Sequence, residues 1–202
     1  MTHPVIAISG IPGAGKTTLA GALAQRLGAR HLCFDAYETL TLAPPEAVAG
    51  WLSRGAPLEE MYDPRLDAEL ARMAGQGPVV FDTPLGRLPA AHARLVTCAI
   101  WIDVPRDVGL ARKLALQTGM GGWDSAGELA DWLCGYLAAY ERVILPSLKV
   151  QAARVMPLSD HVIDGMTPPD AVEAQVWRIV GPRDLDKLAP KIGQADEGRG
   201  QV

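Results

Sequence analysis

The segment with the clearest chemical potential is a glycine-rich loop, GIPGAGKT, at residues 10–17. It matches the pattern GxxxxGK[ST] and lies between an apolar run at 5–9 and a helical pattern at 16–28. Glycines let backbone N–H groups turn towards phosphates, and the amino terminus of the following helix adds its positive end. The spacing therefore predicts a loop that binds nucleotide phosphates. Its residues are Gly10, Ile11, Pro12, Gly13, Ala14, Gly15, Lys16, Thr17 and Thr18.

Two side chains of this loop have chemistry beyond binding. We expect Lys16 to reach the terminal phosphates, where its ammonium group neutralises the charge of the group being transferred. We expect the Thr17 hydroxyl to ligate Mg²⁺. ATP and Mg²⁺ are therefore the predicted cofactors.

Acidic residues mark the ends of three further apolar runs. Asp35 directly follows the second run of the chain, Asp82 closes the third, and Asp103 lies in the fourth. Ligands of open parallel sheets bind beyond the carboxyl ends of the strands, so all three acids are candidates for the site. Asp82 is preferred as the Mg²⁺ ligand of the Walker B type because four apolar residues precede it, and Asp103 is the alternative.

Short apolar runs alternate with longer helical patterns, which is typical of a parallel sheet covered by helices. The runs show no polar alternation, as expected when both faces of a strand are buried. The expected strands are 5–9, 31–34, 78–82, 99–104 and 161–165, and the expected helices are 16–28, 45–53, 64–75, 88–95, 106–117, 126–145 and 168–180. The predicted fold class is α/β, a P-loop NTPase three-layer sandwich. Helices would cover both faces of a five-stranded parallel sheet, with a small helical cap and a lid.

The chain is interpreted as one P-loop domain at 1–180 followed by a loosely ordered tail at 181–202, where large apolar residues are few. The segment 36–63 is too long for an ordinary connection and is predicted to be a helical cap over the substrate. A glycine-rich patch lies within 112–127, which is the predicted lid region.

The bulk composition narrows the class of protein. The 202 residues carry a net charge of −4 without a run of Lys or Arg, which argues against a nucleic-acid partner. The first apolar run ends in the glycine loop, so we expect neither a signal peptide nor a membrane span, and a cytoplasmic location. The three cysteines, Cys33, Cys98 and Cys134, lie in apolar stretches and are interpreted as buried free thiols.

Several classes of nucleotide-binding protein lack support. A GTPase would need an NKxD guanine-reading motif and a transporter ATPase an LSGGQ motif, and the sequence contains neither. A ring-forming motor would need a longer chain with a helical lid domain. A compact nucleotide-dependent kinase of small molecules is the class that remains.

Three segments resemble uridine kinase-like phosphotransferases, a group that borders phosphoribulokinases and pantothenate kinases. LCFDAYETL resembles the second-strand motif, IWIDVPRDVGLARKLA the fourth strand with its helix, and ILPSLKVQAARVMPLSDHVIDG the closing segment. With the loop, the resemblance spans about residues 5–180. It implies ATP-dependent phosphorylation of a hydroxyl of a small molecule, such as a nucleoside or another sugar-like metabolite.

The resemblance also implies roles for individual residues. Asp35 matches the catalytic acid that accepts the proton of the substrate hydroxyl, and Tyr37 follows it closely. Arg112 matches a lid-helix arginine that contacts the transferring phosphates. Asp63, with Tyr62 beside it, matches the acid that holds sugar hydroxyls.

The sequence departs from the family pattern in two places. The second lid arginine should fall near Leu116 but is missing, and Arg87 is the candidate that would reach in instead. The uracil-reading segment before the third strand is also missing, so the identity of the molecule that carries the acceptor hydroxyl stays open.

Two other functions stay open beside the small-molecule kinase. A non-catalytic or regulatory nucleotide-binding protein would account for the missing lid arginine, and a kinase could instead act on a peptide or protein. We expect no membrane partner. A homo-oligomer is one option for the assembly.

Overall fold

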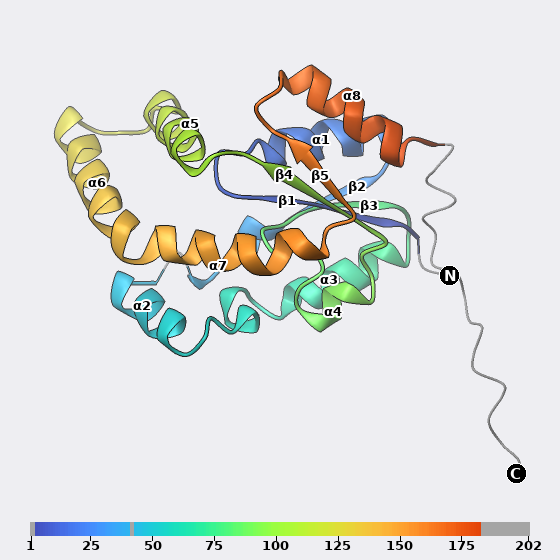
Figure 1. The fold of residues 1–202 in the computed structure, drawn as a ribbon, viewed down its shortest axis with the longest axis horizontal. Helices are drawn as coiled ribbons and strands as arrows, with labels where there is room; N and C mark the ends of the chain where they lie inside the picture. The colour runs from blue at the N-terminus through green and yellow to red at the C-terminus, as the bar shows by residue number, and fades with distance from the viewer. Residues whose placement is uncertain (1–2, 41–42, 183–202) are drawn as a thin grey trace, which may run out of the picture.

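A five-stranded parallel sheet forms the centre of the molecule (Figure 1). The computed structural model describes residues 3–40 and 43–182. The strands are β1 (Val5–Gly10), β2 (Arg30–Cys33), β3 (Val79–Asp82), β4 (Cys98–Asp103) and β5 (His161–Asp164), in the spatial order β2-β3-β1-β4-β5. All neighbouring pairs are parallel. All five predicted strands are thus confirmed, within a residue or so at their ends.

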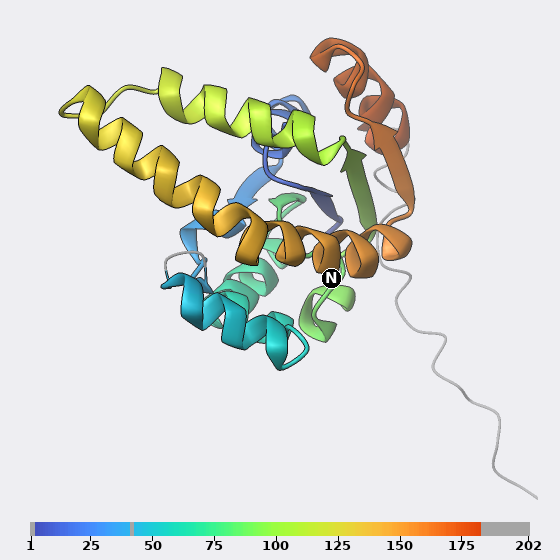
Figure 2. The same cartoon turned by 60° about the vertical axis from the view of Figure 1, so that its left-hand side comes forward.

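Helices cover both faces of this sheet, which makes three layers (Figures 1 and 2). The helices are α1 (Lys16–Leu27), α2 (Pro45–Ser53), α3 (Arg65–Ala74), α4 (Ala90–Ala93), α5 (Arg106–Gly119), α6 (Ala126–Ala139), α7 (Leu145–Val155) and α8 (Pro169–Val180). Helices α1 and α8 lie on one face, and α3 and α4 on the other. The predicted α/β sandwich is confirmed.

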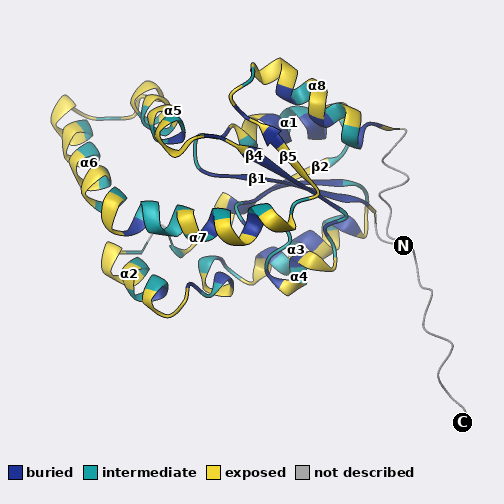
Figure 3. Cartoon of the chain, in the orientation of Figure 1, coloured by how far each residue is buried: buried dark blue, intermediate teal, exposed yellow. Residues whose placement is uncertain are grey.

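The strand β1 shows why the sheet needs cover on both faces. Ile6 and Ile8 pack in a cluster with α1 and α8, whereas Val5 and Ala7 pack in a second cluster with α3 and the segment 51–62. Successive side chains of a strand point to opposite faces, so an unbroken apolar run fills both clusters. The central strands β1, β3 and β4 are accordingly almost wholly buried, whereas the outer strands β2 and β5 are more exposed (Figure 3).

The order of the strands determines where a ligand can bind. From β1 the chain crosses to β2 at one edge, returns to β3, and then crosses to β4 on the other side of β1. In open α/β sheets the crevice for ligands lies where such connections diverge, beyond the carboxyl ends of the strands. The phosphate loop leaves β1 at this point.

The helix predicted at 126–145 is longer in the structure. Helix α6 continues through a π-helical turn, Tyr140–Ile144, into α7, which ends ten residues beyond the predicted end. Pro146 lies in the first turn of α7, where the wider turn before it accommodates the missing N–H. The predicted end at residue 145 is therefore wrong, because the helix continues past Pro146.

The three cysteines differ in their exposure. Cys98 is buried and Cys33 half-buried, but Cys134 is exposed on α6, so the prediction of a buried thiol there is wrong. Burial raises the pKa of Cys98 to about 12. None of the described helices is long and apolar enough to span a bilayer. The predicted tail falls almost wholly outside the described residues.

Candidate functional site

The phosphate loop requires glycine at three positions because its backbone adopts positive φ angles there. Gly10, Gly13 and Gly15 have φ of 152°, 80° and 90°, a region that other residues rarely adopt. At Gly13 space is limiting as well, since an added Cβ would lie 2.2 Å from the carbonyl oxygen of Gly109. The loop is therefore pressed against the first turns of α5.

Gly109 of α5 belongs to the site but was not among the predicted residues. A Cβ on it would lie 2.8 Å from the carbonyl oxygen of Pro12, so only glycine lets α5 approach the loop this closely. The available signal was a glycine inside a helical pattern, which costs about 1 kcal/mol relative to alanine and usually has a packing or functional reason.

The loop ends in the first turn of α1, whose N–H groups lack a side-chain cap. Gly15 is the N-cap residue, and its carbonyl accepts from the Leu19 N–H at 3.0 Å. Ala14 N–H donates to the carbonyl of Ile11 at 3.1 Å, which closes the loop on itself. Uncapped N–H groups at a helix amino terminus form a favourable site for an anion, and Thr17 and Thr18 are exposed beside them.

Lys16 is the charged centre of this edge. Its Nζ donates to the carbonyl of Ile11 at 3.2 Å. Burial lowers the pKa of Lys16, the negative charges of Asp82 and Asp35 oppose that shift, and the positive charge of Lys113 adds to it. Three predicted site residues, Lys16, Asp82 and Asp35, are thus brought within electrostatic reach of one another.

Asp82 is a nearly buried carboxylate with 3% of its surface exposed. It lies at the end of β3, level with Ile8 of β1 and Cys33 of β2. Within the described residues, the hydrogen-bond donor that reaches it is the Cys33 thiol, at 3.8 Å from its Oδ2. A thiol is a weak donor, so this buried charge lacks the compensation that buried carboxylates normally have.

This environment suits a divalent cation. Asp82 and Thr17 offer hard oxygen donors, and Mg²⁺ typically takes one or two protein oxygens and completes its shell with phosphate and water. The described residues contain no group of three or more His, Cys, Asp and Glu side chains that could hold a metal by themselves. Asp103, the alternative ligand, is exposed and accepts from Trp101 Nε1 at 3.3 Å.

Asp35 lies at the same edge in a 3-10 turn, Phe34–Ala36, directly after β2. Phe34 is buried and anchors the turn, whereas Asp35 is exposed. A carboxylate in this position can be reached by a molecule that binds in front of the phosphate loop. Tyr37 follows it half-buried, and its carbonyl accepts from the Asp63 N–H at 2.8 Å.

Asp63 and Tyr62 have structural partners in this conformation. Asp63 accepts from the Arg65 backbone N–H at 2.9 Å and from its guanidinium, and these bonds lower the pKa of Asp63. Tyr62 is buried, and its hydroxyl donates to Asp67 Oδ1 at 3.1 Å. Burial raises the pKa of Tyr62, and its ring packs against His92. The structure therefore turns Tyr62 into the core.

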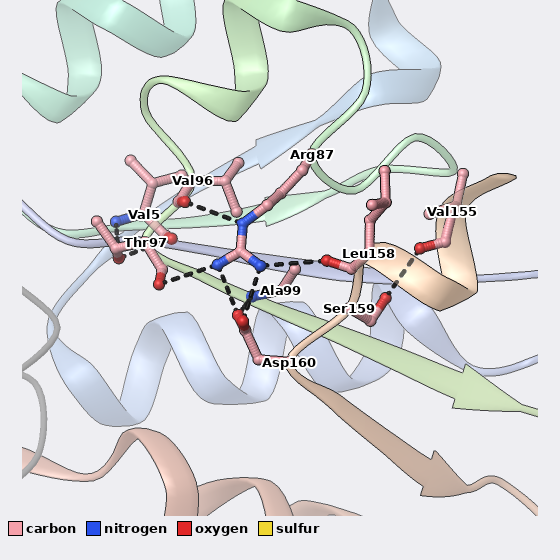
Figure 4. A network of polar contacts seen from close by, with 9 residues as sticks. All are labelled: Val5, Arg87, Val96, Thr97, Ala99, Val155, Leu158, Ser159 and Asp160. Atoms are coloured by element: carbon pink, nitrogen blue, oxygen red, sulfur yellow. Dashed lines mark hydrogen bonds and ion pairs between the residues drawn. The ribbon is translucent and has the colours of Figure 1, made fainter.

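Arg87 lies at the amino ends of the strands, on the opposite side of the sheet from the phosphate loop (Figure 4). Its guanidinium forms an ion pair with Asp160 at 2.6 Å and donates to the carbonyls of Val96, Thr97 and Leu158. These residues precede β4 and β5, and the six residues of β4 span about 20 Å. The structure does not bring Arg87 to the phosphate loop.

Helix α5 brings two basic residues towards the site. Arg112 is exposed and donates to the carbonyl of Gly165 at 3.1 Å, at the carboxyl end of β5. Lys113, the next residue, is the one whose charge acts on Lys16. Arg112 is the residue of this pair that the family resemblance predicted for the site, and Lys113, which occupies the second basic position of the same motif, is a further candidate because its charge acts on Lys16.

Comparison with known proteins supports the architecture. No protein-family model matches the sequence, and a search of curated proteins finds no match. A candidate fructose transport system kinase from Silicibacter sp. TM1040 is similar with a TM-score of 0.53 and 20% identity, over 80% of this chain and 89% of that one.

Two further solved structures are similar at lower scores. A sugar kinase from Janibacter sp. HTCC2649 gives a TM-score of 0.49 and 20% identity, over 87% of this chain and 93% of that one. Shikimate kinase from Aquifex aeolicus vf5 gives 0.46 and 13%, over 90% and 98%. The chain has the P-loop kinase-like α/β fold, and these neighbours do not single out the uridine kinase group.

Proposed function

We propose that this protein is an ATP- and Mg²⁺-dependent kinase that phosphorylates a hydroxyl group of a small molecule. The observation that carries the proposal is the arrangement around Lys16, where Asp82 is buried and Asp35 is exposed at the same edge. A buried carboxylate suits a metal ligand, and an exposed one suits a group that must meet a substrate. Phosphoryl transfer to an acceptor requires a phosphate loop together with a metal-binding carboxylate and a carboxylate that meets the substrate.

Each residue has a role in this scheme. Lys16 stabilises the negative charge that moves between the phosphates, and Lys113 and Arg112 add positive charge from α5. Asp82 and the Thr17 hydroxyl would hold Mg²⁺, which when bound neutralises charge on the phosphates.

Asp35 would act on the acceptor and not on the nucleotide. It orients the acceptor hydroxyl and accepts its proton late in the transfer, since the transition state is loose. Holding the hydroxyl in line is itself worth about 7–11 kcal/mol in well-oriented systems. Water, which nothing positions, should therefore react slowly.

A nucleoside or another sugar-like metabolite is the proposed acceptor. A sugar hydroxyl agrees with the candidate fructose transport system kinase among the fold neighbours. To bind such an acceptor directly, Asp63 would have to release Arg65, and Tyr62 would have to release Asp67. We propose that Asp63 rather than Tyr62 contacts the acceptor, because Asp63 is not fully buried.

The test combines a search for the acceptor with one substitution. Incubation with γ-labelled ATP and a pooled metabolite extract should give a labelled small molecule, and ATP hydrolysis without acceptor should be weak. Asp35→Asn should then lower kcat at least about a hundredfold, the lower scale for lost general-base help, while calorimetry shows ATP binding unchanged. Asp170→Asn is the control, since it makes the same change at an exposed carboxylate of α8, outside the site.

Three results would contradict the proposal. Vigorous hydrolysis without acceptor would make water the recipient. Label on a macromolecule would indicate a peptide or protein kinase. Nucleotide binding without any transfer would indicate a regulatory nucleotide-binding protein.

A further inference from the structure

Gln151 is a buried polar residue of α7 that the scheme above does not use. Its side chain is 9% exposed, although most glutamines lie at the surface. It lies on the side of α7 that faces the sheet, one turn before the fully buried Val155. A buried amide needs hydrogen-bond partners, because an unsatisfied one costs about 1–3 kcal/mol.

Its partners are two carbonyl groups that flank the site. The Gln151 Nε2 donates to the carbonyl of Gly10 at 3.1 Å and to that of Pro84 at 2.9 Å. Gly10 is the first residue of the phosphate loop, and Pro84 lies two residues after Asp82. An amide nitrogen carries two hydrogens, so both are used to bridge the exits of β1 and β3.

The bridge fixes the peptide groups that it holds. In a trans peptide the C=O and the following N–H point in opposite directions, so holding the Gly10 carbonyl towards α7 directs the Ile11 N–H away from it. The segment after Asp82 also packs closely against α7. A Cβ on Gly86 would lie 2.9 Å from Val155 Cγ1 of α7.

Helix α6, the π-helical turn and α7 form one continuous helical rod, residues 126–155. This rod also holds the segment that is proposed to cap the acceptor. One turn beyond Gln151, Arg154 donates to the carbonyls of Gly55 at 2.6 Å and Ala56 at 2.7 Å, directly after α2. At the other end of α2, Glu46 forms an ion pair at 3.0 Å with Arg142 of the π-helical turn. Both ends of α2 are thus attached to the rod that carries Gln151.

We propose that Gln151 is a positioning residue that couples the phosphate loop to the α2 segment. Nucleotide in the loop then restrains Gly10, the restraint passes through the Gln151 amide to α7, and Arg154 carries it to Gly55 and Ala56. The proposal rests on the proposed function in two respects, the binding of nucleotide by the loop and the role of α2 as part of the acceptor cap.

The test measures backbone hydrogen exchange with and without ADP, which needs no acceptor. In the wild-type protein ADP should slow exchange in the loop and also in α2. Gln151→Met keeps the length of the side chain and removes both donors, so ADP should still protect the loop while the protection of α2 falls at least about fivefold. Gln175→Met, the same change at an exposed position of α8, should behave as wild type.

A second variant separates coupling from damage to the loop. Arg154→Met alters an exposed residue and leaves the Gln151 bridge intact, so it should abolish the response of α2 with ADP affinity unchanged within about twofold. Lys149→Met, exposed on the same helix, is its control. This variant also keeps the test decisive if Gln151→Met fails to fold.

The outcomes distinguish this inference from the proposed function. Protection of α2 at the wild-type level in Gln151→Met or Arg154→Met would overturn the coupling, as would wild-type protein in which ADP protects the loop alone, and both results leave the kinase proposal standing. Wild-type protein that does not bind ADP would overturn both. Once the acceptor is known, Gln151→Met should raise its KM more than that of ATP.

Discussion

The sheet has one edge where the amino ends of its strands lie and another where their carboxyl ends lie. Both edges carry charged residues, but the charges are paired at the first and incompletely paired at the second. At the amino-terminal edge the Arg87 guanidinium meets Asp160 and three backbone carbonyls (Figure 4). At the carboxyl-terminal edge Asp82 is buried with a thiol as its donor, and Lys16 has one carbonyl. Charges that are fully paired hold segments together, whereas charges kept close without full pairing are available to a ligand.

The direction of the pKa shifts follows the same division. Burial lowers the pKa of Lys16, and the nearby carboxylates do not fully offset it. Burial also acts on Asp160, but hydrogen bonds from Arg87 and the Ala99 N–H and the Arg87 charge outweigh it, so the pKa of Asp160 is lowered. The charge of Lys16 therefore costs folding free energy at the carboxyl-terminal edge, whereas the ionised form of Asp160 stabilises the fold at the amino-terminal edge.

Loss of Lys16 should give the largest effect. Lys16→Ala should lower the rate of phosphoryl transfer by at least about a hundredfold, because the charge on the transferring phosphates loses its main neutralising group. Its midpoint of thermal unfolding should not fall, since desolvation of the half-buried ammonium lowers the pKa of Lys16 and the substitution removes that cost. Single-turnover transfer and calorimetric melting measure the two. Wild-type turnover, or a marked loss of stability, would show that this edge is structural.

The two acids at the ends of β3 and β4 give the next comparison. Asp82→Asn should raise the Mg²⁺ concentration for half-maximal activity at least about tenfold, the lower scale for altered metal surroundings. Asp103→Asn should leave it within about twofold, because that residue is exposed and bonded to Trp101. Titration of activity with Mg²⁺ at constant ATP checks this. The opposite ranking would mean that Asp103 is the ligand.

The amino-terminal edge should respond in stability only. Arg87→Met should lower the free energy of unfolding by about 1–3 kcal/mol, since the substitution removes the ion pair of Asp160 and the donor to three carbonyls. Turnover per folded molecule should stay unchanged. Urea unfolding measures the change, with Arg94→Met as the exposed control. If turnover falls while stability does not, Arg87 acts at the site after all, as the sequence analysis expected.

The smallest effect concerns pH at the same edge. The folded-state pKa of Asp160 lies below its ordinary value of 3.8, so its ionised form stabilises the fold above about pH 4 and this contribution is lost as pH falls through the lowered pKa. The stability difference between wild type and Asp160→Asn should therefore shrink between about pH 5 and pH 2. Urea unfolding at several pH values follows it, and a constant difference would contradict the ionic pairing.

The sequence predicted the strands and the loop well because both depend on local patterns. Continuous apolar runs identify strands that are buried on both faces, and the glycine spacing identifies positive φ angles. Arg87 and Tyr62 could not be placed in this way. The partners of Arg87 begin nine residues later and end at Asp160, and Tyr62 is buried by contacts with Phe34 and His92, which no local pattern contains.

The π-helical turn at Tyr140–Ile144 has a consequence for how the chain length is constrained. Helical residues are about 100° apart around the axis, so a single residue gained or lost in this turn would rotate α6 relative to α7 by about that angle. With Gln151 fixed on the phosphate loop, the rotation would fall on α6, which has no fully buried residue to resist it. The direction of α6 therefore depends on the number of residues in this turn, and we expect insertions and deletions there to be tolerated less easily than substitutions.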